Sequence, residues 1–285
     1  MIRSPARKSR RSPRRGVLGG LVFLLLAAAP GRGHAEEKPL RTTPAEAPFP
    51  HTPRTEWMKV EGPTGARFLT AVLRPKGTGP FPVVVVLHGS NGLTQSYLSV
   101  AEDVARAGFV VVLGCWQAGD ANTVGTRICS EATPQARWVA DPAGNSGKEL
   151  IALARTLKGG RADRIGLLGI SRGGHAALWA ASTGAGVQAV VVDAPAHAPN
   201  VDPAPAKPLD VLAGLAAPVL MLHGTADPVI PVGQSQEYER AARAAGKDVT
   251  ALYFGGVGHM ALLAPESQVD ARKRAITFLK EHLSN

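Results

Sequence analysis

A serine that follows a short apolar run is the first residue whose surroundings suggest chemistry. Residues 169–173 read GISRG, a G-x-S-x-G pattern with Ser171 at its centre. In this motif the serine occupies a sharp, strained turn from a strand into a helix, and its neighbours must be small so that nearby backbone can pass. The apolar run Ile165–Leu168 precedes it and the alanine-rich stretch Gly174–Ala181 follows. We therefore predict that Ser171 is a nucleophile.

An aspartate and a histidine follow two later apolar runs. Asp227 comes after Val219–Leu222, and His259 comes after Val249–Phe254 on a glycine-rich loop. A serine hydroxyl is a weak nucleophile at its free pKa, so a histidine must remove its proton. A carboxylate then fixes the imidazole tautomer and stabilises the imidazolium. The chain order Ser, Asp, His is that of one serine-hydrolase fold, and it predicts a catalytic triad of Ser171, Asp227 and His259.

A second aspartate keeps one alternative open. Asp193 ends the apolar run Val187–Val192 and could supply the triad acid, although the strand, glycine and loop around Asp227 fit the pattern better. Four other histidines are not expected to take part in catalysis: His88, His175, His197 and His223. We expect supporting positions for His88, His175 and His223. His197 is expected in a solvated loop, and a place in the substrate pocket is its alternative.

An oxyanion site should lie beside the triad. After the apolar run Val83–Leu87 the chain reads HGSNG at 88–92. We expect the backbone N–H groups of Ser90 and Arg172 to bind the tetrahedral oxyanion, with Asn91 as an alternative donor. Loss of one such donor raises the barrier by about 2.7–4 kcal/mol. Asn91 and Trp116 are expected to line the substrate pocket, and packing in the core is the alternative for Trp116.

The elements that must position these residues alternate along the chain. Short apolar runs and amphipathic stretches in alternation predict an α/β fold with a mainly parallel central sheet and helices on both faces. Chemistry in such sheets sits at the carboxyl ends of the strands. The predicted strands are Phe68–Leu73, Val83–Leu87, Val110–Leu113, Ile165–Leu168, Val187–Val192, Val219–Leu222 and Val249–Phe254, and the predicted helices are Leu98–Ala107, Glu149–Leu157, Gly174–Ala181, Gln236–Ala245 and Asp270–His282.

Together these motifs resemble the α/β-hydrolase superfamily over residues 56–285, and most of all its dienelactone-hydrolase-type serine hydrolases. The resemblance implies cleavage of a small-molecule carboxylic ester through an acyl-enzyme, without a cofactor. Dienelactone hydrolases proper carry a cysteine at the elbow, so Ser171 favours ordinary esters over lactones. A peptidase, a thioesterase and a lactone hydrolase could use the same triad. A catalytically silent binding protein of this fold is the non-enzymatic alternative.

Charge is distributed unevenly along the chain. The net charge is +10, and residues 1–35 hold eight of the 32 basic residues and no acidic one. The near-neutral remainder gives no reason to expect nucleic acid as a partner. Residues 1–35 have the basic start, short apolar run Gly16–Ala29 and small residues before Glu36 that are typical of a signal peptide. Export to the periplasm or medium is expected, with no stable membrane anchor after cleavage. An uncleaved anchor and twin-arginine export remain open alternatives.

Residues 36–55 are rich in proline, glutamate and threonine, and we expect a flexible lead-in to a hydrolase domain over 56–285. Cys115 and Cys129 are the two cysteines, and in an exported protein such a pair favours a disulfide. Closing a loop of this size would stabilise the fold by about 3 kcal/mol. No motif with metal-ligand spacing is present, so no metal site is expected. The sequence leaves the substrate and the oligomeric state open.

Overall fold

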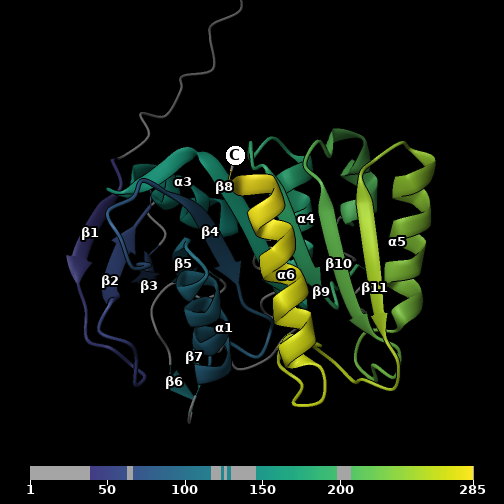
Figure 1. Ribbon diagram of the computed structural model, residues 1–285, viewed down its shortest axis with the longest axis horizontal. Coiled ribbons are helices and arrows are strands. Elements are labelled where there is room, and N and C mark those ends of the chain that lie inside the picture. Colours follow the sequence, from purple (N-terminus) through teal and green to yellow (C-terminus); the bar gives the residue numbers. More distant parts are fainter. Residues whose placement is uncertain are drawn as a thin grey trace, which may run out of the picture. The chain divides into compact units, whose positions relative to one another are not determined.

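The computed structural model describes residues 39–62, 67–116, 123–124, 127–129, 146–197 and 207–284. The predicted signal peptide, 1–35, lies outside these residues, as do parts of the loops after Trp116 and His197. Within the described part of the chain, nine strands form one sheet in the order β1-β2-β3-β5-β4-β8-β9-β10-β11 (Figure 1). These strands are β1 (Arg41–Pro44), β2 (Thr55–Glu61), β3 (Arg67–Leu73), β4 (Phe81–Leu87), β5 (Val110–Gly114), β8 (Gly160–Ile170), β9 (Ala189–Asp193), β10 (Val219–Gly224) and β11 (Val249–Phe254), and a separate hairpin joins β6 (Thr123–Val124) to β7 (Arg127–Ile128).

The sheet is parallel from β5 to β11 and antiparallel at its other side, where β3 pairs with β5, β2 with β3 and β1 with β2. Side chains alternate along a strand, so each parallel strand contributes to two cores. In β4, Val84 and Val86 join one buried cluster, whereas Val83 and Val85 join the other. The predicted mainly parallel sheet is confirmed.

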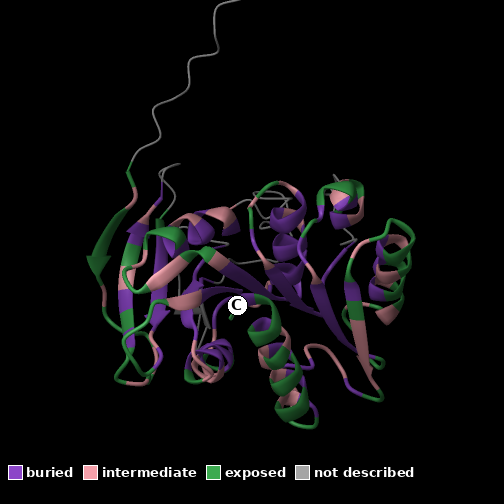
Figure 2. Cartoon of the chain, turned by 45° about the horizontal axis from the view of Figure 1, so that its top comes forward, coloured by how far each residue is buried: buried purple, intermediate pink, exposed green. Residues whose placement is uncertain are grey.

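Helices cover both faces of the sheet. Helices α1 (Gln95–Arg106) and α6 (Gln268–Leu283) supply the first core cluster, and they lie on the same face in Figure 1. The opposite face is covered by α3 (Gly147–Thr156), α4 (Arg172–Ser182), α5 (Val232–Ala244) and the 3-10 helix η1 (Pro208–Gly214). Figure 2 shows the buried residues concentrated on the central strands and on the helix sides that face them. This confirms the predicted α/β fold.

Strand β1 corrects one expectation. Residues 36–55 were expected to form a flexible lead-in, yet Arg41–Pro44 pairs antiparallel with β2, from Arg41 opposite Glu61 to Pro44 opposite Met58. All four residues of β1 are exposed, so the segment has no apolar alternation that could have revealed a strand. Pairing of its backbone with β2 places it at the sheet edge. The expectation is wrong for Arg41–Pro44.

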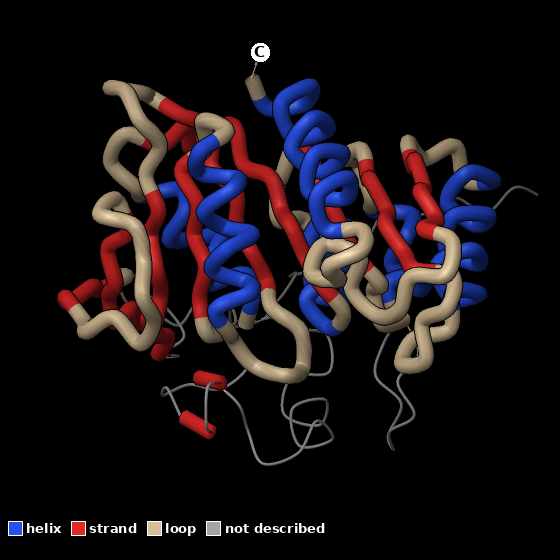
Figure 3. The backbone as a smooth tube through the Cα atoms, turned by 60° about the horizontal axis from the view of Figure 1, so that its bottom comes forward, coloured by secondary structure: helices blue, strands red, loops and turns tan. Residues whose placement is uncertain are grey.

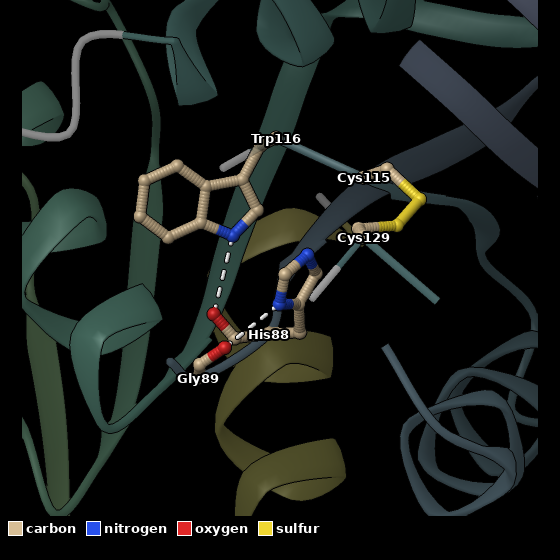
Figure 4. Close-up of a disulfide and its surroundings, with 5 residues drawn as sticks. All are labelled: His88, Gly89, Cys115, Trp116 and Cys129. Carbon is tan, nitrogen blue, oxygen red and sulfur yellow. Dashed lines mark hydrogen bonds between the residues drawn. A yellow bond between two sulfur atoms is a disulfide. The ribbon is translucent and has the colours of Figure 1, made fainter. Parts of the chain in front are cut away.

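A disulfide joins Cys115, directly after β5, to Cys129, directly after β7, with their Cα atoms 5.4 Å apart (Figure 4). The predicted pairing is confirmed. Both residues are completely buried in the first core cluster. In the part of the chain that the structure describes, no helix has the length and apolar character needed to cross a membrane.

Candidate active site

Ser171 forms the turn between β8 and α4. Its φ is 57°, a left-handed backbone conformation that residues other than glycine rarely adopt. This conformation costs of order 1–3 kcal/mol. A Cβ atom at Gly169 would collide with the Gly173 carbonyl, and one at Gly173 would collide with the Leu87 carbonyl. The requirement for small residues on both sides of the serine is therefore confirmed, and the elbow has the strained geometry that the motif predicts.

Three predicted residues come together at the carboxyl ends of the parallel strands, the edge that Figure 3 turns toward the viewer. The His259 Nε2 atom lies 3.1 Å from the Ser171 hydroxyl. On the other side of the ring, His259 Nδ1 donates to Asp227 Oδ2 at 2.7 Å. The hydrogen bond to the carboxylate fixes the tautomer that leaves Nε2 free to accept the serine proton. Residues 88 positions apart in the chain thus form one hydrogen-bonded line.

Four donors surround the Asp227 carboxylate. Oδ1 accepts the backbone N–H groups of Val229 and Ile230 at 2.8 and 2.9 Å. Oδ2 accepts His259 and, at 3.1 Å, the Nε2 atom of His223. Burial by itself raises the pKa of Asp227, but the bonds from His259 and the two backbone groups outweigh it and leave the pKa below its ordinary value. The carboxylate is therefore ionised at neutral pH.

His223 is the second histidine that bonds the Asp227 carboxylate. Its Nε2 faces both Asp227 and the Ile230 carbonyl, at 2.9 Å, so this nitrogen carries the hydrogen. Its Nδ1 then accepts the Ser235 hydroxyl at 2.7 Å. Burial lowers the pKa of His223, which keeps the ring neutral. The expected supporting position of His223 is confirmed. Sequence analysis missed Ser235, because a serine inside an amphipathic helix carries no signal of such a contact.

Asp193, the alternative acid, has different partners. Its carboxylate accepts the backbone N–H groups of Ala261 and Leu262 at 3.1 and 2.7 Å. The residue is completely buried, and burial raises its pKa to about 7 against the lowering effect of these two donors. The hydrogen bond to the His259 ring comes from Asp227, whereas Asp193 contacts the backbone that follows this histidine.

The loop after β4 lies against Ser171. A Cβ atom on Gly89 would sit 3.2 Å from Ser171 Cβ, so Ser90 follows a residue in near contact with the elbow. The Gly89 N–H donates to the Tyr97 hydroxyl at 3.0 Å, which donates in turn to Asn91 Oδ1 at 2.8 Å. The side-chain oxygen of Asn91 is thus used to brace its own loop. Tyr97, one residue before the predicted helix, is a support that the sequence did not reveal.

Trp116 lies beneath this loop rather than in a pocket wall. Its side chain is 1% exposed and belongs to the second core cluster. Figure 4 shows its indole N–H donating to the His88 carbonyl, at 3.1 Å. The Arg172 guanidinium lies over its ring, 5.4 Å from the centroid. The pocket-wall expectation is wrong, because this large side chain packs in the core, which was the alternative, and donates a hydrogen bond to the loop after β4.

Two other histidines are buried in the same region. His175 packs in α4 and bonds the Ala196 carbonyl at 2.8 Å, as expected for a supporting residue. His197, expected in solvent or in the pocket, is instead 3% exposed and stacks on Tyr238 with centroids 5.0 Å apart. Burial lowers its pKa to about 3. Among the residues that the structure describes, no group of three or more His, Cys, Asp or Glu side chains could hold a metal ion.

Comparison with known proteins identifies relatives of this chain and solved structures with a similar fold. A Bradyrhizobium protein named "Probable 2-oxo-3-(5-oxofuran-2-ylidene)propanoate lactonase" is 30% identical over 213 residues, which are 72% of this chain and 82% of that protein. Among solved structures, a dienelactone hydrolase-like promiscuous phosphotriesterase from metagenomic libraries matches with a TM-score of 0.65 and 18% identity, over 80% of this chain and 99% of that one. Dipeptidyl peptidase 4 of Porphyromonas gingivalis matches with a TM-score of 0.65 and 19% identity, over 80% of this chain and 35% of that one.

These two structural likenesses, at such low identity, concern the fold alone. The family assignment comes from the sequence, because the pattern of the dienelactone hydrolase family matches residues 68–283, which include the elbow, both aspartates and the loop of His259. The chain therefore belongs to the dienelactone hydrolase family, a family of hydrolases.

Proposed function

We propose that this protein is a serine hydrolase that cleaves small-molecule carboxylic esters. The observation that carries the proposal is the hydrogen-bonded line from Ser171 through His259 to Asp227, with links of 3.1 and 2.7 Å. Its catalytic groups would be the Ser171 hydroxyl, the His259 imidazole and the Asp227 carboxylate. A protein that only bound ligands would have no need of this alignment on a strained elbow.

Acylation of Ser171 is the first half of the proposed reaction. His259 Nε2 removes the Ser171 hydroxyl proton as the oxygen attacks the ester carbonyl carbon, and the carbonyl oxygen becomes an oxyanion. In the proposed site the backbone N–H groups of Ser90 and Arg172 bind that oxyanion. When the intermediate collapses, the carbon–alkoxy bond breaks and the imidazolium returns its proton to the leaving alcohol. Ser171 is left as an acyl ester.

Deacylation repeats these steps with water. His259 takes a proton from a water molecule, whose oxygen attacks the acyl carbon, and the same N–H groups bind the second oxyanion. Collapse breaks the bond to Ser171, and the serine oxygen recovers the proton from the imidazolium. The products are a carboxylic acid and an alcohol, and this chain's own groups move every proton without a cofactor.

Lactone opening is the second candidate. The Bradyrhizobium relative bears a lactonase name, and a lactone is a cyclic ester whose alcohol stays attached to the acyl group after ring opening. Ser171 in place of the cysteine of dienelactone hydrolases favours ordinary esters. Peptides and thioesters remain further substrates for the same groups.

Export is part of the proposal. The predicted signal peptide over 1–35 would carry the chain out of the cytoplasm, and the disulfide between Cys115 and Cys129 supports an oxidising compartment. An N-terminus at Glu36 on the protein recovered outside the cytoplasm would support this placement. Recovery of the chain only from the cytoplasm, with its N-terminus at Met1, would contradict it.

The experiment compares p-nitrophenyl esters of increasing acyl length with a lactone and a dipeptide, on the wild type and on Ser171→Ala. We expect ester turnover and labelling by a fluorophosphonate probe in the wild type, and neither in the variant. Rapid lactone opening with negligible ester turnover would select the second candidate. Absence of both labelling and turnover in the wild type would contradict the serine-hydrolase proposal.

A further inference from the structure

Asp193 is a buried carboxylate for which the proposed reaction has no use. It ends β9, beside Ile170 of β8 and Leu222 of β10, with 0% of its surface exposed. A carboxylate removed from water needs hydrogen-bond donors, and burying it without them is costly. Its two oxygens meet the N–H groups of Ala261 and Leu262. Hydrogen bonds from the backbone of one loop therefore replace water around the Asp193 carboxylate.

That loop carries His259. Met260, between the histidine and the two bonded residues, has a φ of 69°, which turns the chain sharply. The carbonyls of the next two residues are bonded from the other side: Ser267 Oγ donates to Ala261 at 2.8 Å, and Arg272 Nε donates to Leu262 at 2.9 Å. Donors from α6 and its preceding turn thus hold the carbonyls, and Asp193 holds the N–H groups.

The backbone of Asp193 contacts the nucleophile as well. Its carbonyl accepts the Ser171 N–H at 2.8 Å. One residue at the end of β9 is thus bonded to the elbow through its main chain and to the His259 loop through its side chain. The distance between Ser171 Oγ and His259 Nε2 depends on how these two segments are placed relative to each other.

We propose that Asp193 is a positioning residue, which keeps His259 in line with Ser171 by anchoring the backbone at Ala261 and Leu262. This inference rests on the proposed serine-hydrolase function. Catalytic groups must be held within about 0.5 Å of the productive geometry. A displacement of about 1 Å can cost about 100-fold in rate, so a loosened loop would reduce turnover while Asp227 still bonds the imidazole.

Asp193→Asn is the sharpest test, because the amide keeps the shape but has one acceptor oxygen for two N–H donors. Its NH₂ group would face a backbone N–H, and the loop would shift. We expect kcat for an ester to fall by about 10- to 100-fold, with KM within about twofold of the wild type. Val190→Ala is the matched control, because it comes from the same strand and is buried in the second core cluster, away from the His259 loop.

Two esters of one acid separate positioning from a general loss of folded protein. The p-nitrophenolate group leaves without a proton, whereas an ethoxide must be protonated by His259 as it leaves. A displaced imidazole should therefore lower kcat/KM, which reports acylation, several-fold more for the ethyl ester than for the p-nitrophenyl ester; the later loss of the shared acyl group is the same for both. A lower folded fraction slows both equally, and the fraction of sites labelled by the fluorophosphonate probe corrects for it.

The outcomes are distinct. Selective loss on the ethyl ester in Asp193→Asn, with an unchanged ratio in Val190→Ala, supports the proposal. The proposal is overturned if Asp193→Asn has the wild-type kcat/KM, or if its kcat/KM falls equally for both esters after correction. The proposed function is then still supported, provided that the wild type turns over esters and Ser171→Ala does not. If the asparagine variant does not fold, Asp193→Ser takes its place, because it is smaller and keeps one acceptor. Failure of both to fold, with Val190→Ala folded, assigns Asp193 to folding and also overturns the proposal.

Discussion

Asp193 and Asp227 lie at or just beyond the carboxyl ends of neighbouring strands, yet their carboxylates have opposite surroundings. Asp193 ends β9, and Asp227 lies three residues beyond the end of β10. Asp227 accepts two imidazole and two backbone donors, and its pKa is below the ordinary value. Asp193 accepts two backbone donors, and burial raises its pKa to about 7.

The difference shows that a strand-end position does not assign a catalytic acid. A carboxylate can stabilise a developing imidazolium only if an imidazole N–H points at it and enough other donors keep it ionised. Asp227 meets both conditions. Asp193 meets neither, because its oxygens are already bonded to the loop backbone. Each prediction below tests this division of roles.

The largest expected effect is that of Asp227→Asn on kcat. The amide cannot hold the productive imidazole tautomer, so kcat for an ester should fall by about 10⁴-fold, as expected for a triad acid. The measurement is steady-state turnover with the active sites counted by the fluorophosphonate probe. A larger loss in Asp193→Asn than in Asp227→Asn would reverse the assignment of the acid.

The two carboxylates should change the free energy of unfolding in opposite directions as pH rises. The pKa of Asp193 is about 7 in the fold, against 3.8 for an aspartate in an unfolded chain, so the folded state retains a proton between about pH 4 and 7. Its contribution to the free energy of unfolding is therefore lost as pH rises through that window, by at most about 4 kcal/mol. The lowered pKa of Asp227 acts in the opposite direction, and its contribution is lost as pH falls below about 4.

Urea unfolding at several pH values between about 4 and 7 measures the slope, in the wild type and in Asp193→Asn. The comparison is needed because His197, whose pKa burial lowers to about 3, gives a slope of opposite sign over much of the window. We expect the variant to gain stability relative to the wild type as pH rises. Parallel curves would show that Asp193 is ionised throughout.

His223→Asn should affect Asp227 and leave Asp193 unchanged. The asparagine amide can still bond Ser235 but is too short to reach the carboxylate, which loses one of its two side-chain donors. A hydrogen bond to a charged group contributes about 1.5–3 kcal/mol, so kcat/KM should fall by roughly 10- to 150-fold. His223→Gln is the control, because its longer amide can keep the bond to Asp227. Equal losses in both variants would show that packing of the ring, rather than its N–H, is what counts.

Ser235→Ala should have the smallest effect. Two acceptors, Asp227 and the Ile230 carbonyl, already hold the hydrogen of His223 on Nε2, so the tautomer survives without the serine hydroxyl. We expect a stability loss of about 1–3 kcal/mol from the unpaired, buried Nδ1, with kcat/KM changed by less than about threefold. A loss of kcat/KM as large as that of His223→Asn would mean that Ser235 controls the tautomer.

Strands with a continuous apolar run could be predicted, and strands without one, such as β1 and β2, could not. The runs Val83–Leu87 and Val110–Leu113 lie in β4 and β5 because continuous valine suits a strand buried on both faces. Strand β1 has no buried residue. Strand β8 begins at Gly160, and the prediction started only at Ile165 because the first five residues of the strand are not buried. Backbone pairing, which residue types do not encode locally, forms β1; at the start of β8 it joins Gly160 to Phe81, and the register then shifts to place Ile165 opposite Val83.

Residue types and their spacing were enough to predict the α/β fold, the small residues around Ser171 and the order in which serine, aspartate and histidine follow their strands. These are local properties: apolar runs of a given length, a motif and a spacing. Which aspartate contacts the imidazole, and the supporting positions of Tyr97, Trp116 and Ser235, became visible only in the folded chain. Hydrogen bonds between segments far apart in the chain depend on small differences in distance, which only the packed sheet and its helices define.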